Sequence, residues 1–354
     1  MTAPSVAAPL ARERPVFRCA LLMLGLVLTL MLVSATASAA QTTAAEAASP
    51  SAAEGDFAGL VDIGAGRRLW LECRGRGSPT VLLEAGTGND ADTWDAAGLA
   101  AGAQPPAVLP GVATFTRVCA YDRPGTLLDA DRPGRSDPAP MPRTTAQMVA
   151  DLHALLGAAQ VPGPYVIVAH SFGGLVARLY AATYPADVAG LVLVDAAHED
   201  YYAHLRAALM PAQWAAATGA IAPAGSNAER IDTTASAAQM RRAAAAAPLP
   251  DLPLVVITHG RPWAWPAGYP ADALEALWMP LQRKLAALTP DAQLTIACDS
   301  DHDIPGEQPG LIVAAVRQVI AAVRDPASWP PQHALPAPDE AACHGRASVR
   351  TMSP

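Results

Sequence analysis

The sequence predicts an α/β fold in which a mostly parallel sheet of eight strands is covered by helices on both faces. Short apolar runs bounded by Gly, Pro or Asp recur along the chain and alternate with stretches of helical periodicity. The last six runs are almost continuously apolar, as strands covered on both faces should be. One run stops at a serine that leads directly into a helical stretch. The expected strands are residues 59–64, 68–74, 80–86, 117–122, 165–170, 190–195, 252–260 and 293–298.

The stretches between these strands predict helices. Residues 145–156 begin at a threonine, repeat apolar residues with a 3.6-residue period and stop before a glycine. Another helix follows Ser171, and a last one begins near Pro309, because proline suits a first turn. Residues 198–251 are rich in alanine and polar residues and contain helical fragments. We expect a small helical lid here, inserted after the sixth strand.

The N-terminal segment, residues 1–39, predicts a signal peptide. Three arginines precede an apolar run over 19–33, and small residues follow at Ala37 and Ala39. The run is shorter than the ~20 residues that a membrane-spanning helix needs. We therefore expect a secreted or periplasmic protein with no stable membrane insertion after cleavage, while an uncleaved anchor stays open as the alternative.

The rest of the chain divides into three parts. Residues 40–56 are an Ala/Ser-rich linker, residues 57–325 are long enough for one large domain, and residues 326–354 form a Pro-rich tail. Removal of residues 1–39 takes away three arginines and one glutamate, which changes the formal net charge from −8 to −10. Because phosphate binding needs a basic surface, we expect no nucleic-acid partner. The oligomeric state stays open.

Ser171 is the candidate nucleophile. It follows the strand over 165–170 and is followed by Gly173. In a nucleophile elbow the chain leaves a buried strand, makes a strained turn at the serine and enters a helix, so that Oγ is exposed above the sheet. The positions two before and two after the serine must be small, and here they are Ala169 and Gly173.

A serine hydroxyl needs a base, and the base needs a third group that orients it. His302 is the leading candidate, because it follows the last strand and therefore lies at the carboxyl edge of the sheet, where Ser171 also emerges. His259, at the end of another strand, is the second choice or a pocket residue. His170 must point away from Oγ, and we expect it to pack or hydrogen bond beneath the elbow.

The expected acid is Asp195, which ends the strand after the elbow helix and emerges at the same edge. The segment after the next strand offers no carboxylate until Asp272 and Glu275, which stay open as alternatives. Asp299, Asp301 and Asp303 flank the histidine and are interpreted as solvated or turn-capping groups. We expect no metal and no cofactor.

A tetrahedral intermediate needs two preset N–H donors, which form the oxyanion hole. The first is expected from Phe172, directly after the nucleophile. The second is expected from the glycine-rich loop after the third strand, with Thr87 as the first choice and Gly88 as the next.

The chain contains, in this order, the segments LLEAGTGNDADTW, YDRPG, GRSDP, VADLHALL, GPYVIVAHSFGG, GLVLVDAAHE and SDHDIP. Together these segments resemble the α/β-hydrolase fold family, in its esterase-like branch, over about residues 57–325. The order nucleophile, acid, histidine in that family is matched by Ser171, Asp195 and His302.

The sequence departs from the family pattern in three places. Ala169 replaces the first elbow glycine, Ala85 stands where an oxyanion-loop histidine is common, and Asp195 follows the sixth strand instead of the seventh. Only the third departure bears on a residue assignment.

Four cysteines remain after residue 39: Cys73, Cys119, Cys298 and Cys343. Export makes disulfides permissible, four cysteines allow three pairings, and buried free thiols stay open as the alternative. In the fold that the chain resembles, the second strand lies beside the fourth. The resemblance therefore implies Cys73 with Cys119, and then Cys298 with Cys343.

The resemblance implies a secreted serine hydrolase that cleaves a small-molecule carboxylic ester through an acyl-enzyme. A serine nucleophile argues against dehalogenase and epoxide hydrolase activities, because those relatives use a carboxylate. A peptidase or amidase that grips a substrate amine through Glu199 or Asp200, a perhydrolase with the same residues, and a noncatalytic binding protein stay open. The sequence does not predict the acyl length. The candidate pocket aromatics are Trp94, Trp214, Trp263, Trp265 and Trp278.

Overall fold

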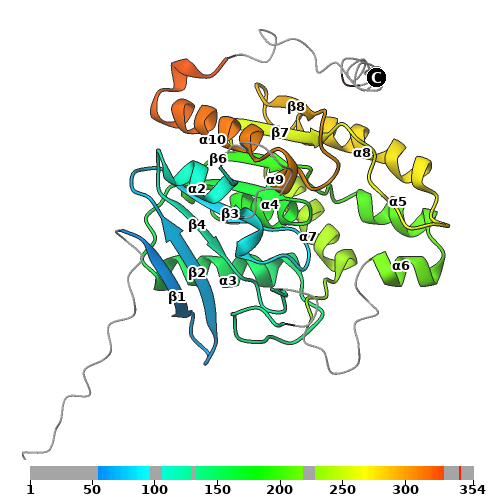
Figure 1. Cartoon of the computed structure of the whole chain (residues 1–354), viewed down its shortest axis with the longest axis horizontal. Coiled ribbons are helices and arrows are strands. Elements are labelled where there is room, and N and C mark those ends of the chain that lie inside the picture. The colour runs from blue at the N-terminus through cyan, green and yellow to red at the C-terminus, as the bar shows by residue number, and fades with distance from the viewer. Residues whose placement is uncertain (1–54, 96–105, 129–131, 218–227, 331–342, 344–354) are drawn as a thin grey trace, which may run out of the picture. The chain divides into compact units, whose positions relative to one another are not determined.

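The centre of the molecule is a sheet of eight strands in the order β1-β2-β4-β3-β5-β6-β7-β8 (Figure 1). The computed structural model describes residues 55–95, 106–128, 132–217, 228–330 and Cys343. The β1/β2 and β2/β4 pairs are antiparallel and every other pair is parallel. The eight predicted strands are confirmed: β1 Phe57–Asp62, β2 Arg68–Arg74, β3 Thr80–Glu84, β4 Val118–Tyr121, β5 Tyr165–His170, β6 Val188–Val194, β7 Leu254–His259 and β8 Gln293–Ala297.

Helices cover both faces of this sheet, as the continuously apolar strands predict. Successive residues of a strand point to opposite faces, so Val166 and Val168 of β5 join one hydrophobic cluster while Ile167 joins the other. The first cluster includes residues of α2 (Val108–Ala113) and α10 (Pro309–Arg324), and the second includes residues of α3 (Thr145–Ala158) and α4 (Gly173–Thr183). The remaining described helices are η1 Ala91–Trp94, η2 Pro185–Asp187, α5 Tyr201–Ala208, α6 Pro211–Ala217, α7 Thr233–Ala246, α8 Ala271–Leu285, α9 Ile304–Glu307 and η3 Pro326–Ser328.

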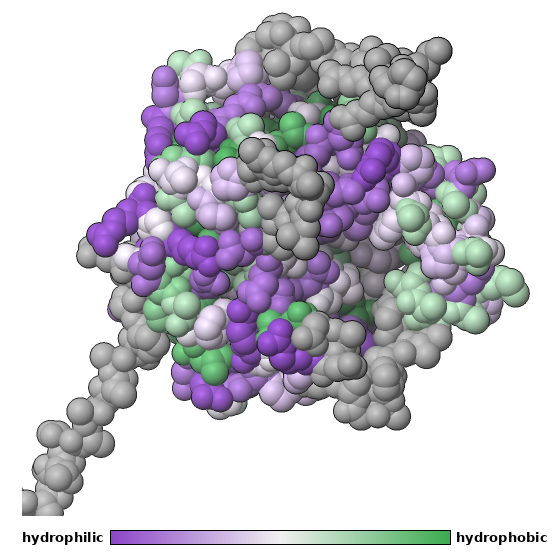
Figure 2. Space-filling model, in the orientation of Figure 1, coloured by the Kyte–Doolittle hydropathy of each residue, from purple (hydrophilic) through white to green (hydrophobic). Residues whose placement is uncertain are grey.

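The segment between β6 and β7 is helical and contributes α5, α6 and α7. A small hydrophobic cluster, which includes Tyr201, Leu205 and Trp278, joins α5 to α8. Figure 2 shows a mostly hydrophilic face with mildly hydrophobic residues gathered over α5 and α6 at its right-hand side. Met210, between these two helices, is 69% exposed.

The predicted signal peptide, the linker and most of the Pro-rich tail lie outside the described residues. Within the described ranges we find no helix that has both the length and the apolar character needed to cross a bilayer.

Two disulfide bonds join the cysteines in the pairing that the resemblance implied. Cys73 on β2 and Cys119 on β4 are register partners in the sheet and are bonded to each other. Cys298, directly after β8, is bonded to Cys343.

We predict that the Cys73→Ala/Cys119→Ala variant folds but is less stable by about 2–4 kcal/mol, because the bond restricts the unfolded chain. Urea unfolding of the wild type and the variant measures the difference. Reduction of the wild type, which breaks both disulfides, should also lower its stability. Linear Cys73 and Cys119 peptides with free thiols in an unreduced digest would contradict the bond.

Candidate active site

Ser171 lies in a strained turn between β5 and α4. Its φ is +54°, in the left-handed region that a serine rarely adopts. A Cβ at Gly173 would lie 2.6 Å from the carbonyl oxygen of Glu84, so only glycine fits two residues after the serine. Ala169, two residues before it, is fully buried, and its methyl group packs in the core beneath the sheet edge. The turn therefore accommodates alanine at the position where the family pattern has its first glycine.

His302, in the loop between β8 and α9, joins the serine to a carboxylate. Its Nε2 lies 3.0 Å from Ser171 Oγ, and its Nδ1 lies 2.6 Å from Asp195 Oδ2. The indole of Trp263 stacks on the imidazole, with ring centroids 4.0 Å apart and planes 12° apart. His170 approaches the main-chain oxygen of His302 through Nε2 at 2.9 Å, beneath the elbow.

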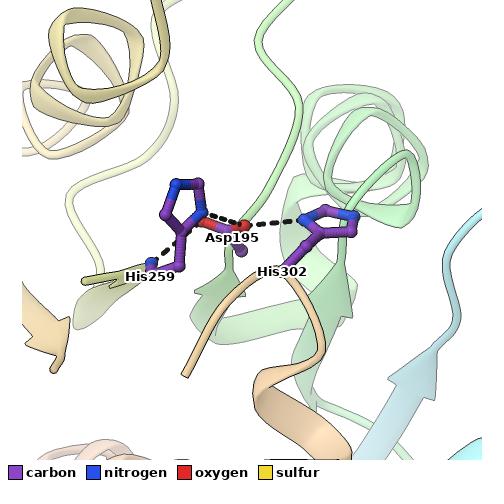
Figure 3. Close-up of side chains that lie close together, drawn as sticks. All are labelled: Asp195, His259 and His302. Atoms are coloured by element: carbon purple, nitrogen blue, oxygen red, sulfur yellow. Dashed lines mark hydrogen bonds and ion pairs between the residues drawn. The ribbon is translucent and has the colours of Figure 1, made fainter. Parts of the chain in front are cut away.

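Asp195 is fully buried directly after β6, with φ +43°. Its Oδ1 accepts hydrogen bonds from the indole N–H of Trp278 at 2.7 Å and from Thr258 and the backbone of His259. Its Oδ2 accepts from the Nδ1 atoms of His302 and His259 (Figure 3). Burial alone would raise the pKa of this carboxyl, but the bonds from the two histidines hold it below its ordinary value.

His259 contacts two carboxylates, which the sequence did not suggest. Its Nδ1 lies 2.7 Å from Asp195 Oδ2, and its Nε2 lies 2.8 Å from Glu275 Oε1 on α8. Glu275, one of the two alternative acids, therefore bonds with His259 and not with His302. Burial alone would lower the pKa of His259, but hydrogen bonds to Asp195 and Glu275 raise it to about 10.

The two predicted oxyanion donors lie in the loop after β3 and at the start of α4. Thr87 lines the cavity beside Ser171, and Phe172 begins the turn into α4. The amide of Gly88, the second choice for a donor, instead donates to Glu229 Oε2 at 2.7 Å. Within the described residues, no hydrogen bond engages the amides of Thr87 and Phe172.

A buried ion cluster holds the glycine loop in position. The guanidinium of Arg123, 2% exposed, donates to the carbonyl oxygens of Ala85 and Gly86 and forms ion pairs with Glu84 and Glu229. Burial opposes the charge of Arg123, but the two glutamates outweigh it and raise its pKa well above the ordinary value. The carbonyl groups of the loop are therefore held by hydrogen bonds from a buried, charged guanidinium.

A cavity of about 780 Å³ opens above Ser171 and His302. Aromatic rings from the helical segment after β6, from α8 and from the loop after β7 form much of its wall. Trp263, Trp265 and Trp278 are among them, whereas Trp94 is buried in the core. Asp301 and Asp303 are the charged side chains other than histidine in the described lining.

Donor atoms of Asp195, His259 and His302 lie within 4.8 Å of one another, a set that has the chemistry of a metal site. The separations between Asp195 Oδ2 and the two Nδ1 atoms are those of hydrogen bonds. We therefore interpret the three side chains as a hydrogen-bonded group.

Residues 79–245 match the family model described as the alpha/beta hydrolase fold. The strand order, the strained serine and the late histidine agree with that match. The chain has the α/β-hydrolase fold.

Other members of this fold resemble the chain at low identity. A candidate lipase from Acinetobacter baumannii is 17% identical with a TM-score of 0.52, covering 76% of this chain and 92% of that one. The haloalkane dehalogenase DatA from Agrobacterium tumefaciens is 15% identical with a TM-score of 0.53, covering 76% of this chain and 98% of that one. At such identities the likeness shows the fold alone.

Among curated relatives, the uncharacterized protein YqjL of Bacillus subtilis is 31% identical over 127 residues, or 36% of this chain and 43% of that one. The chain spans less than half the length of the curated relatives that it matches.

Sequence reasoning missed three contributors to this α/β-hydrolase site. Trp263 was proposed only as a pocket residue, yet it stacks on the imidazole of His302. Arg123 lies in the YDRPG segment, which supported the family resemblance but received no role. Glu229 lies in the helical segment after β6, where nothing in the local pattern marked it.

Proposed function

We propose that this hydrolase-fold protein is a serine esterase that cleaves carboxylic esters through an acyl-enzyme at Ser171. The observation that carries the proposal is the continuous chain of hydrogen-bond contacts from Ser171 Oγ through His302 to Asp195, at 3.0 and 2.6 Å. Family and fold support hydrolase activity, and these contacts supply the nucleophile, the base and the group that orients the base.

The reaction uses the same histidine twice. His302 Nε2 takes the proton of Ser171 as Oγ attacks the acyl carbon, and Asp195 stabilises the imidazolium that forms. The amides of Phe172 and Thr87 bind the oxyanion. The protonated histidine then gives its proton to the leaving alcohol, and a water molecule activated by His302 releases the acid.

The surroundings favour an ester over a peptide substrate. Glu199 and Asp200 are the carboxylates with which a peptidase could grip a substrate amine. Glu199 is buried against Arg178 at 2.7 Å, and Asp200 pairs with Lys284 at 2.8 Å. We further propose that the helical segment over 198–251 acts as the lid. The protein would act after export, since the two disulfides suit an oxidising compartment.

We predict that a fluorophosphonate probe labels the wild type and does not label Ser171→Ala, because only an activated serine reacts with it. Gel fluorescence and peptide mass measure the labelling. Equal labelling of both proteins would refute the nucleophile assignment. Activity on aminoacyl amides with none on p-nitrophenyl esters would favour a peptidase.

We predict that Asp195→Asn lowers kcat on p-nitrophenyl esters by about 10⁴, the loss seen when a triad acid becomes an amide. The amide neither stabilises the imidazolium nor enforces the productive tautomer. Steady-state kinetics measure the loss, and circular dichroism verifies the fold. A near-normal rate would transfer the role to Asp272 or Glu275.

We predict a preference for neutral over negatively charged acyl groups. Apart from histidine, the charged groups in the described cavity wall are carboxylates, which would repel a negatively charged acyl group. Mono-p-nitrophenyl glutarate, which has a free carboxylate, should have a kcat/KM about tenfold below that of methyl p-nitrophenyl glutarate, in which that carboxylate is methylated. A tenfold difference corresponds to about 1.4 kcal/mol. In the double variant Asp301→Asn/Asp303→Asn the kcat/KM values of the two esters should become more alike, because the negative charge is gone. Asparagine can still cap α9, so the helix should be preserved. Equal rates in the wild type would contradict the preference.

A further inference from the structure

His259 is a buried histidine with a carboxylate at each ring nitrogen. It ends β7, and its side chain is 3% exposed. Asp195 lies at Nδ1 and Glu275 lies at Nε2, both at hydrogen-bond distance. A neutral imidazole carries a proton on one nitrogen only, so its other nitrogen would face a carboxylate oxygen with no proton between them. Both contacts are satisfied only when the ring is an imidazolium.

We propose that His259 is a positioning residue, a buried imidazolium that fixes the carboxylate of Asp195 and offsets part of its charge at His302. The proposal rests on the proposed serine esterase function. It concerns a residue that touches neither substrate nor Ser171 and that acts through Asp195.

The geometry explains how the second histidine acts on the first. Asp195 Oδ2 is shared by both Nδ1 atoms, at 2.6 Å from His302 and 2.7 Å from His259. Asp195 attracts a proton to His302, whereas a cation at His259 repels it. A cation at His259 therefore opposes a second positive charge at His302, where the reaction needs a free base.

Besides Asp195, titratable and aromatic groups from α5 and α8 lie near His259. Glu275 faces it from α8, and the indole of Trp278, also on α8, stacks beside it with centroids 5.9 Å apart. Tyr201 on α5 is kept neutral, because burial and the two carboxylates raise its pKa. Arg283, also on α8, lines one cavity together with His259 and Glu275.

The raised pKa of His259, about 10, agrees with this charge state. The ring would therefore lose its proton only in the alkaline range, well above the acid limb of the kcat/KM profile. The charge of His259 is therefore constant across that limb. A mutation that removes this charge should shift the limb as a whole and should not add a second ionisation to it.

The test is the pH dependence of kcat/KM for a neutral p-nitrophenyl ester in the wild type, His259→Gln and Glu275→Gln. We expect the acid limb to move to higher pH by about one unit in His259→Gln. Glu275→Gln should shift it less in the same direction, because the ring remains but its charge is less favoured. The matched control is His153→Gln, which removes a half-exposed histidine from α3 and should leave the limb in place.

An acid limb that stays in place in both variants, even with a lower kcat, would show a structural role only and overturn the proposal. NMR detection of the His259 ring nitrogens in the wild type, assigned by their loss in His259→Gln, tests the charge state independently of activity. Two protonated nitrogens at slightly alkaline pH are expected, and one unprotonated nitrogen would also overturn it. Fluorophosphonate labelling of the wild type separates this outcome from failure of the esterase function.

Discussion

The active edge of the sheet depends on one buried negative charge, the carboxylate of Asp195. A carboxylate that is removed from water is costly unless it is fully hydrogen bonded and paired. Its donors come from β7, from α8 and from the loop before α9. The hydrogen bonds to one side chain therefore connect three segments that are distant in sequence. One of these bonds, from His302, also holds the imidazole next to Ser171.

The glycine loop on the other side of Ser171 depends on a buried positive charge in the same way. Arg123 needs acceptors, and it finds them in Glu84, Glu229 and two carbonyl oxygens of the loop. Glu229 in turn accepts from the amide of Gly88, which removes that amide from the candidates for the oxyanion hole. The apolar core sets the fold, whereas ion clusters set the geometry on both sides of the serine.

The sequence predicted what strands and turns determine locally. Ser171, Asp195 and His302 each follow a strand directly or closely, and parallel strands bring their carboxyl ends to one edge, so a linear pattern could place them together. It could not show that His259 contacts Asp195, since several histidines end or follow strands at that edge and their side-chain directions depend on tertiary packing. The ion pair of Arg123 spans 106 residues to Glu229 and lacked any local signal.

The two parts of the helical segment after β6 are anchored by different interactions. Near Glu229 the chain is fixed by the buried ion pair and by backbone hydrogen bonds of Arg143 with Arg230 and Asp232. In contrast, α5 is held to α8 by the cluster around Tyr201 and Trp278. Because Trp278 also donates to Asp195, a movement of α5 that disturbed α8 would reach the buried carboxylate. The indole of Trp278 thus contacts both the cavity and the buried carboxylate.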